Sequence, residues 1–205
     1  MKSSANLLEG MKRMPYLSKD SVQQLGTQLD LNEGTINSYI SRYFKRRQLH
    51  KLKRGFYVSA DFLDRHGLET SYVFYLANVL RTPSYVSSWT ALQYYDLTTE
   101  AILTITSVTP KITRTYQTKA GTFIYQSINK ELFTDFSLVK GTFEFFIASP
   151  SKALFDLLYF RTHQFRGTSR DKVMALIEEL RIDFDEMDDS EQKKFHAMLT
   201  PYIHE

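Results

Sequence analysis

Polar and basic side chains between positions 37 and 45 are spaced so that one face of a single helix could carry them. At 100° per residue, Ser38, Ser41 and Lys45 share that face, and Asn37 and Arg42 flank it. Small side chains let a helix approach base edges closely, and Asn, Arg and Lys supply donors used in major-groove readout. A helix face turned to solvent would also be polar, so the interpretation as a DNA-reading helix depends on the residues around it.

The chain stays basic after this helix. Leu49 and Leu52 bracket basic positions in a strand-like run, and Arg54-Gly55 supplies a turn before the apolar residues 56–58. A hairpin with cations on its first arm and its turn could lie along a phosphate backbone or enter a minor groove, although a solvated charge run is the alternative. The residues predicted to contact DNA are Asn37, Ser38, Ser41, Arg42, Lys45, Arg46, Arg47, Lys51, Lys53 and Arg54.

Two more helices are predicted ahead of this one, and the sequence assigns no role to the first. The first covers residues 3–13 and ends before Pro15, and the second covers 19–28 behind Ser18 as an N-cap. A tight turn then leads to Asn32, a predicted cap for the polar helix that begins near residue 33. Helix, turn, polar helix and basic hairpin in this order are typical of a winged helix-turn-helix.

Charge divides the 205-residue chain into two parts. The first 60 residues contain eleven Lys and Arg against four Asp and Glu, whereas the rest is acidic on balance. Clustered cations favour a polyanion through counterion release, and an acidic surface does not. We therefore predict two domains, a DNA-binding domain at 1–64 and a second domain at 65–205.

The second domain is predicted to be α+β. Helical spacing covers 72–80 and 89–95, followed by strand patterns at 102–108, 112–116, 122–128 and 142–147, which indicate an antiparallel sheet. Helical spacing returns after Pro150, at 173–180 and at 195–199. The expected fold class is an N-terminal winged helix-turn-helix followed by a larger mixed domain with an antiparallel sheet and several helices.

Residues for catalysis or cofactor binding are not grouped in this sequence. The five histidines lack metal-ligand spacing, and there is neither a phosphate-binding loop nor a dinucleotide fingerprint. Ser87 and Ser88 have no base nearby and are interpreted as helix caps, whereas Lys152 could bind an anion at a helix start or be an ordinary surface lysine. We therefore expect no enzyme activity, cofactor or metal.

The cellular location of the protein is predicted from features that its sequence lacks. It has no cysteine, no signal peptide and no apolar run long enough to span a membrane. These observations predict a cytoplasmic protein that does not contact membranes.

Two motifs of the second half resemble a known family. They are Pro83-Ser84-Tyr85-Val86-Ser87 with Ala91-Leu92, and the run from Ile147 to Tyr159, which reads Ile-Ala-Ser-Pro-Ser-Lys-Ala-Leu-Phe-Asp-Leu-Leu-Tyr. With the Gly-Phe-Tyr-Val strand at 55–58, they are similar to the AbiEi antitoxin family over most of residues 15–160. The resemblance implies an antitoxin that represses its own operon at inverted repeats and neutralises a nucleotidyltransferase toxin, with the C-terminal domain associated with neutralisation.

An alternative function and the oligomeric state stay open. The second domain could sense a small ligand or carry an enzymatic activity directed at nucleic acid, which predicts a deep pocket with convergent polar groups within residues 65–160. The protein could act as a monomer or as a homodimer, and a homodimer would bind half-sites spaced by about one helical turn or a multiple of it.

Overall fold

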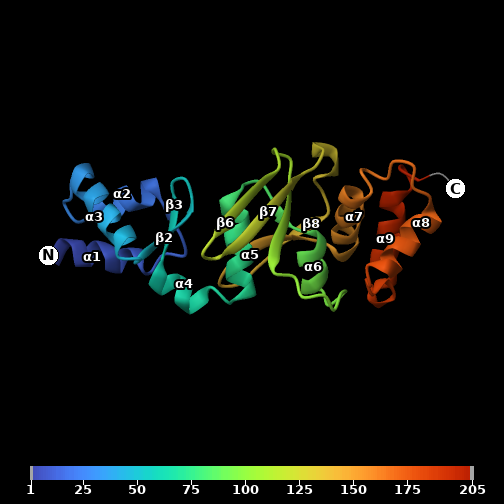
Figure 1. The fold of residues 1–205 in the computed structure, drawn as a ribbon, viewed down its shortest axis with the longest axis horizontal. Helices are drawn as coiled ribbons and strands as arrows, with labels where there is room; N and C mark the ends of the chain where they lie inside the picture. Colours follow the sequence, from blue (N-terminus) through green and yellow to red (C-terminus); the bar gives the residue numbers. More distant parts are fainter. Residues whose placement is uncertain (1, 204–205) are drawn as a thin grey trace.

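The structure, a computed structural model, describes residues 2–203 and is elongated, with the two ends of the chain at opposite ends of the molecule (Figure 1). Helices and a small sheet form the N-terminal part, a six-stranded sheet occupies the middle, and three helices end the chain. The fold class is therefore α+β, as the sequence predicts.

The N-terminal part contains three helices and a three-stranded antiparallel sheet of order β1-β3-β2. Two of its helices begin where the sequence predicts caps: the Ser18 side chain accepts from Ser21 N, and the Asn32 side chain accepts from Thr35 N. The elements are α1 (Lys2–Met11), β1 (Leu17–Ser18), α2 (Lys19–Thr27), α3 (Glu33–Lys45), β2 (Leu49–Lys53) and β3 (Phe56–Ser59).

Helix α1 belongs to the core of this part, which explains an N-terminal segment that had no predicted role. Leu7 and Met11 are fully buried among residues of α2 and α3. The Tyr43 hydroxyl of α3 donates to the Ser4 carbonyl oxygen at 2.5 Å. A module of about 60 residues has little apolar surface to bury, so the extra helix adds core that the other two could not supply.

The remaining elements build the larger sheet and its helices. They are α4 (Ala60–His66), α5 (Thr70–Leu80), β4 (Tyr85–Val86), α6 (Ser88–Tyr94), β5 (Thr104–Thr109), β6 (Arg114–Thr118), β7 (Gly121–Ser127), β8 (Phe136–Val139), β9 (Phe145–Ala148), α7 (Pro150–Arg161), α8 (Arg170–Glu179) and α9 (Asp189–Leu199), with 3-10 turns at Lys130–Leu132 and Phe184–Glu186. Helix α4 spans the predicted domain boundary between residues 64 and 65.

The large sheet is mixed, so the prediction of an antiparallel sheet is wrong. Its order is β6-β7-β5-β4-β9-β8, and both the β5–β7 and the β4–β9 pairs are parallel. Strand β7 inserts between β5 and β6 because it carries the buried side chains Phe123 and Tyr125, whereas the exposed, polar β6 suits the edge. Local patterns identified β5, β6 and β7, but the order of neighbouring strands depends on which strand can be buried.

Three strands have no counterpart in the prediction. β1 and β4 contain only two residues each, too few to show alternation, and β8 follows a 3-10 turn. β9 begins at Phe145 rather than Thr142, and β6 covers 114–118 rather than 112–116. Short strands of this kind are recognisable only through their partners.

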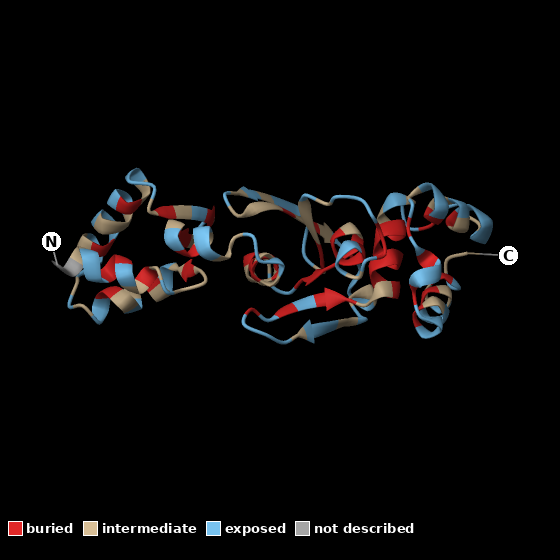
Figure 2. Cartoon of the chain, turned by 90° about the horizontal axis from the view of Figure 1, so that it is seen from below, coloured by how far each residue is buried: buried red, intermediate tan, exposed pale blue. Residues whose placement is uncertain are grey.

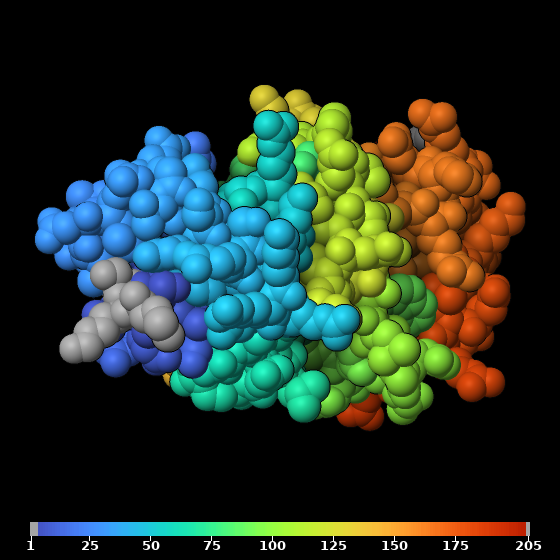
Figure 3. Space-filling view, turned by 60° about the vertical axis from the view of Figure 1, so that its left-hand side comes forward, coloured from blue at the N-terminus to red at the C-terminus, as the bar shows by residue number. Residues whose placement is uncertain are grey.

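The hairpin β2–β3 contributes to both hydrophobic cores. Leu49 lies in the N-terminal core, whereas Leu52 and Val58 pack into the core of the larger sheet. The Tyr72 hydroxyl of α5 also donates to the Pro15 carbonyl at 2.7 Å. Figure 3 shows the cyan hairpin segment beside the yellow-green strands of the large sheet, which β2 contacts through β6. Apolar contacts thus cross the boundary predicted near residue 64.

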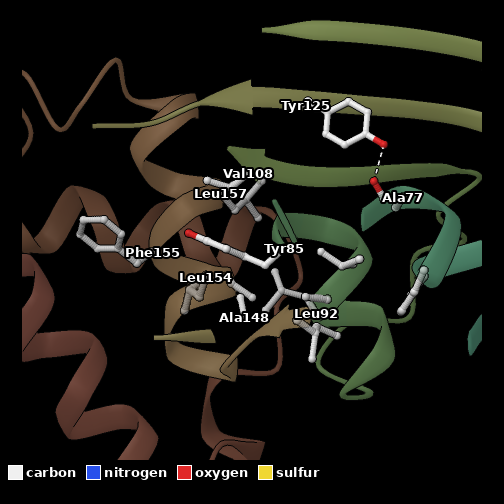
Figure 4. Close-up of a cluster of buried hydrophobic side chains, with 14 of the residues drawn as sticks. Ala77, Tyr85, Leu92, Val108, Tyr125, Ala148, Leu154, Phe155 and Leu157 are labelled. Atoms are coloured by element: carbon white, nitrogen blue, oxygen red, sulfur yellow. Dashed lines mark hydrogen bonds between the residues drawn. The ribbon is translucent and has the colours of Figure 1, made fainter. Parts of the chain in front are cut away.

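Helix α7 is buried on all sides, because every residue from Ser151 to Tyr159 is buried between the sheet, α6 and α9. Figure 2 shows the buried residues concentrated in this central region. Figure 4 shows Tyr85 of β4 among apolar side chains, with its hydroxyl directed toward α7. Within residues 2–203, no helix combines the length and the apolar character needed to cross a bilayer.

Candidate nucleic-acid interface

The outward face of α3 carries the polar set that the sequence places there. Asn37, Ser38, Ser41, Arg42 and Lys45 are all exposed. Ile36 and Tyr43 point the other way and are almost completely buried, with exposed fractions of 1% and 3%. The outward face contains no acidic residue, because Glu33, the acidic residue of α3, lies in its first turn. The predicted division of α3 into two faces is therefore confirmed.

Close packing beneath α3 holds this face in place. Helix α2 approaches α3 at Gly26, where an added Cβ would stand 2.2 Å from Cδ1 of Ile36. On the buried side of α3, the Tyr43–Ser4 hydrogen bond joins this helix to α1. Arg42 lies across the Tyr39 ring, with its guanidinium carbon 4.6 Å from the centroid. These contacts fix the rotation of α3, so the polar side faces solvent.

Basic residues continue past the end of α3 without acidic partners. Arg46 and Arg47 form the exposed turn that leads into β2, and Arg47 has a positive φ of 57°. Lys51 is exposed on β2, and Arg54 is exposed before Gly55, whose φ of 78° closes the hairpin. In the part of the chain that the structure describes, no ion pair involves Arg42, Lys45, Arg46, Arg47, Lys51 or Arg54.

Lys53 is separated from the other predicted contacts. The register of β2 against β3 shifts between Lys51 and Lys53, and Lys53 is half-buried as a result. Its Nζ donates to the Leu80 carbonyl at 2.7 Å and lies 3.8 Å from the centroid of the Phe56 ring. Burial lowers the pKa of Lys53, and the charges of Arg81 and Lys111 lower it further.

Arg81 and Lys111 are cations near the hairpin that sequence reasoning did not single out. Arg81 donates to the Ile112 carbonyl, and Lys111 donates to the Thr82 carbonyl at 2.6 Å. The Leu80 and Thr82 carbonyls lie at the C-terminal end of α5, where carbonyls attract cations, which gives the Lys53 and Lys111 contacts a structural role. No sequence signal connects positions 53, 81 and 111, because only the packing of the hairpin on the second sheet brings them together.

A buried polar cluster beside the large sheet is formed by Tyr85, Ser87, Lys152 and Asp156. Lys152 and Asp156 make an ion pair at 1% and 0% exposure, and the hydroxyls of Ser87 and Tyr85 donate to Asp156 at 2.7 and 3.0 Å. Burial raises the pKa of the Asp156 carboxyl, while Lys152 and both hydroxyls favour its charged form. Because no member of the cluster reaches the surface, its role is to compensate the buried charges of Lys152 and Asp156 within the protein.

This cluster corrects two predictions. Lys152 is neither a surface lysine nor placed for an incoming anion, because it lies in the buried stretch 151–159 of α7 and is paired with Asp156. Ser87 is the N-cap residue of α6 but makes no capping hydrogen bond, since its hydroxyl donates to Asp156 instead. Ser88 is also buried, and its hydroxyl has no partner among the described residues.

Histidine and carboxylate side chains do not converge into a metal site. Within residues 2–203, no group of three or more such side chains lies close enough to hold an ion. Residues of the acidic segment 183–191 have structural roles. The Asp188 side chain caps α9, and the Glu191 side chain is buried against Ser151 of α7. The exposed basic face of the N-terminal part is thus the best-defined candidate interface.

Neither a comparison of the chain with models of known protein families nor a search of curated proteins finds a match.

Proposed function

We propose that this protein is a transcriptional repressor that binds duplex DNA through a winged helix-turn-helix, with α3 in the major groove and the β2–β3 hairpin along the phosphates. One observation carries the proposal: six exposed cations lie on α3 and on the turn and hairpin that follow it, and none of them has an ionic partner among the described residues. Uncompensated positive charge beside small polar side chains is the footprint that phosphates and base edges require.

The order of elements supports this interpretation. Helix, short strand, helix, helix and hairpin follow one another, and β1 and β2 pair with opposite edges of β3. The hairpin leaves α3 at its basic end, where Lys45, Arg46 and Arg47 lead directly into β2. A helix in a groove and a hairpin at its end would contact consecutive parts of the same duplex.

A salt titration of the full chain tests the proposal. Its affinity for the DNA upstream of its own reading frame is compared with that for a scrambled duplex of equal length, between 50 and 200 mM salt. We expect preference for the upstream DNA, with log K falling by about 0.9 for each phosphate neutralised per unit of log salt. Absence of binding to both duplexes would refute the proposal, and equal binding to both would refute the repressor function.

We further propose that this repressor is an antitoxin that neutralises a nucleotidyltransferase-like toxin. The support is the resemblance to AbiEi antitoxins, whose two matching motifs here form β4, α6 and α7. Residues 151–159 are buried throughout, so they are suited to hold the second domain together and not to contact a toxin. Neutralisation by contact would therefore use the surface of this domain.

Co-expression with the product of the neighbouring reading frame separates the two activities. A chain with Arg42→Ala and Lys51→Ala should lose repression yet still rescue growth from the toxin, if the second domain neutralises by contact. If this variant loses both repression and rescue, the protection from the toxin comes from repression and not from contact. Failure of the unaltered chain to rescue any toxic neighbour would remove the antitoxin function and leave the repressor.

A further inference from the structure

A hollow in the second domain lies where the large sheet is interrupted. Strand β4 contains only two residues, and its parallel pairing with β9 is limited to Val86 and Ile147. Next to that pair, the Asn78 side chain of α5 makes hydrogen bonds that the backbone of a neighbouring strand would otherwise make. Its Oδ1 accepts from Phe146 N at 2.6 Å, and its Nδ2 donates to the Ser84 carbonyl at 3.3 Å. A cavity of about 280 Å³ opens beside this bridge, between α5, the 82–84 segment, β8 and β9.

Aromatic rings make up much of its wall. Tyr75, Phe133, Phe136 and Phe146 line it. The Phe136 and Phe146 rings stand nearly perpendicular with centroids 5.8 Å apart, and Phe133 lies 5.0 Å from Phe136. Phe146 is 40% exposed, an unusual amount for an aromatic side chain inside a sheet. Because aromatic faces carry negative potential, a group of them attracts cations with apolar substituents.

Ser84 and Glu144 supply polar groups of the lining that are available to a ligand. Ser84 is only 5% exposed, and its hydroxyl has no hydrogen-bond partner among the described residues. A buried hydroxyl without a partner is uncommon and indicates a missing donor or acceptor. Glu144 is exposed at the same cavity and forms no ion pair within residues 2–203. Asn78, by contrast, has both amide atoms occupied.

We propose that this cavity binds a small organic cation whose ammonium group carries alkyl substituents. The rings would contact the alkylated head group, Glu144 would balance its charge, and the Ser84 hydroxyl would bond a polar group on the ligand. A primary ammonium would need several acceptors that an aromatic wall does not provide. The proposal does not depend on DNA binding, and it gives the second domain a ligand.

Three soluble probes of nearly the same shape test the charge requirement on the full chain. Choline is the cation, 3,3-dimethylbutan-1-ol its neutral counterpart, and 3,3-dimethylbutanoate the anion. Binding is followed by NMR shifts of the residues lining the cavity. We expect choline to bind about 5-fold or more tightly than the alcohol, in line with a partly desolvated cation–π contact. Equal binding of choline and the alcohol, or no binding of choline, would overturn the proposal.

The anion tests the opposite electrostatic possibility. Lys111 donates to the Thr82 carbonyl, and Thr82 lines the cavity, so a positive field from Lys111 could control the site. Tighter binding of the carboxylate than of choline would show that it does and would overturn the proposal.

Two variants test the residues assigned to the cation. Glu144→Gln should weaken choline about 5-fold and leave the alcohol unchanged, whereas Glu178→Gln, on the exposed surface of α8, should change neither. Phe146→Leu keeps an apolar side chain but removes the ring, so it should weaken choline more than the alcohol. If Glu144→Gln and Phe146→Leu both leave choline binding unaltered, the cavity does not recognise the cation and the proposal fails.

Discussion

Gly26 of α2 and Ile36 of α3 approach so closely that a Cβ on Gly26 would lie 2.2 Å from Ile36 Cδ1 and 2.6 Å from Cγ1. Ile36 is 1% exposed and Gly26 is buried, so neither side chain nor backbone has free space to move into. The angle at which the outward face of α3 is presented depends on this contact.

Gly26→Ala should therefore destabilise the protein even though alanine is the better helix former. We expect a loss of about 1–3 kcal/mol from overpacking, measured as a lower urea midpoint at an unchanged m-value. Ile36→Val removes Cδ1, so the double variant should recover part of that loss in a double-mutant cycle. Additive effects of the two changes would contradict the contact.

Arg42 and Lys51 should affect DNA binding differently. Arg42 lies on the outward face of α3, so Arg42→Ala should cost about 1–3 kcal/mol on the upstream DNA and reduce the preference over a scrambled duplex. Lys51→Ala should weaken both duplexes about equally and lower the salt slope by about 1. Lys172→Ala, on the exposed surface of α8, is the matched control. Unchanged affinity in both variants would refute the assigned interface.

Lys53 should contribute little to the salt slope, although it lies between Lys51 and Arg54. Its ammonium already donates to the Leu80 carbonyl, and its pKa is lowered by burial. Lys53→Met keeps an apolar side chain against Phe56 and should lower stability while leaving the salt slope within error of the original. A fall in the slope as large as that of Lys51→Ala would show that Lys53 leaves this position to bind phosphate.

Removing one member of the buried ion pair should be costly. Lys152→Met would leave the Asp156 carboxyl inside the protein without its cation, and we expect a loss of about 3–5 kcal/mol in urea unfolding. Lys172→Met, an exposed position, should be close to neutral. Equal stability of the two variants would mean that Asp156 takes up a proton at little cost.

Glu191 should give the protein a stability that disappears in acid. Burial opposes its ionisation, but hydrogen bonds from Lys194 at 2.6 Å and from Ser151 outweigh this and hold the pKa of Glu191 below its usual value. A lowered folded-state pKa means that the contribution is complete above the unfolded value of about 4.3 and is lost as the pH falls through the folded value.

Glu191→Gln tests this sign directly. The variant should be less stable than the original protein at pH 6, and the difference should shrink as the pH is lowered from 5 to 3. Urea midpoints of both chains across that range provide the measurement. A difference that stays constant or grows toward low pH would contradict the assigned direction.

The sequence by itself determined the local elements whose signals lie within a few residues. Ser18 and Asn32 cap their helices as predicted, since a cap needs only a side chain and a backbone amide two or three positions ahead. The two faces of α3 follow equally well, because a 3.6-residue period sorts Ile36 and Tyr43 away from Ser38 and Ser41.

Tertiary structure decided what depends on partners distant in the chain. Lys53 turns inward because Leu80 lies beside it. Lys152 and Asp156 are close in sequence, but their ion pair is buried because Ser87 and Tyr85, distant in the chain, donate to the Asp156 carboxylate. The parallel pairing of β5 with β7 likewise reflects which strand has apolar side chains to bury. Burial and strand order are properties of the whole packed chain, so no local pattern contains them.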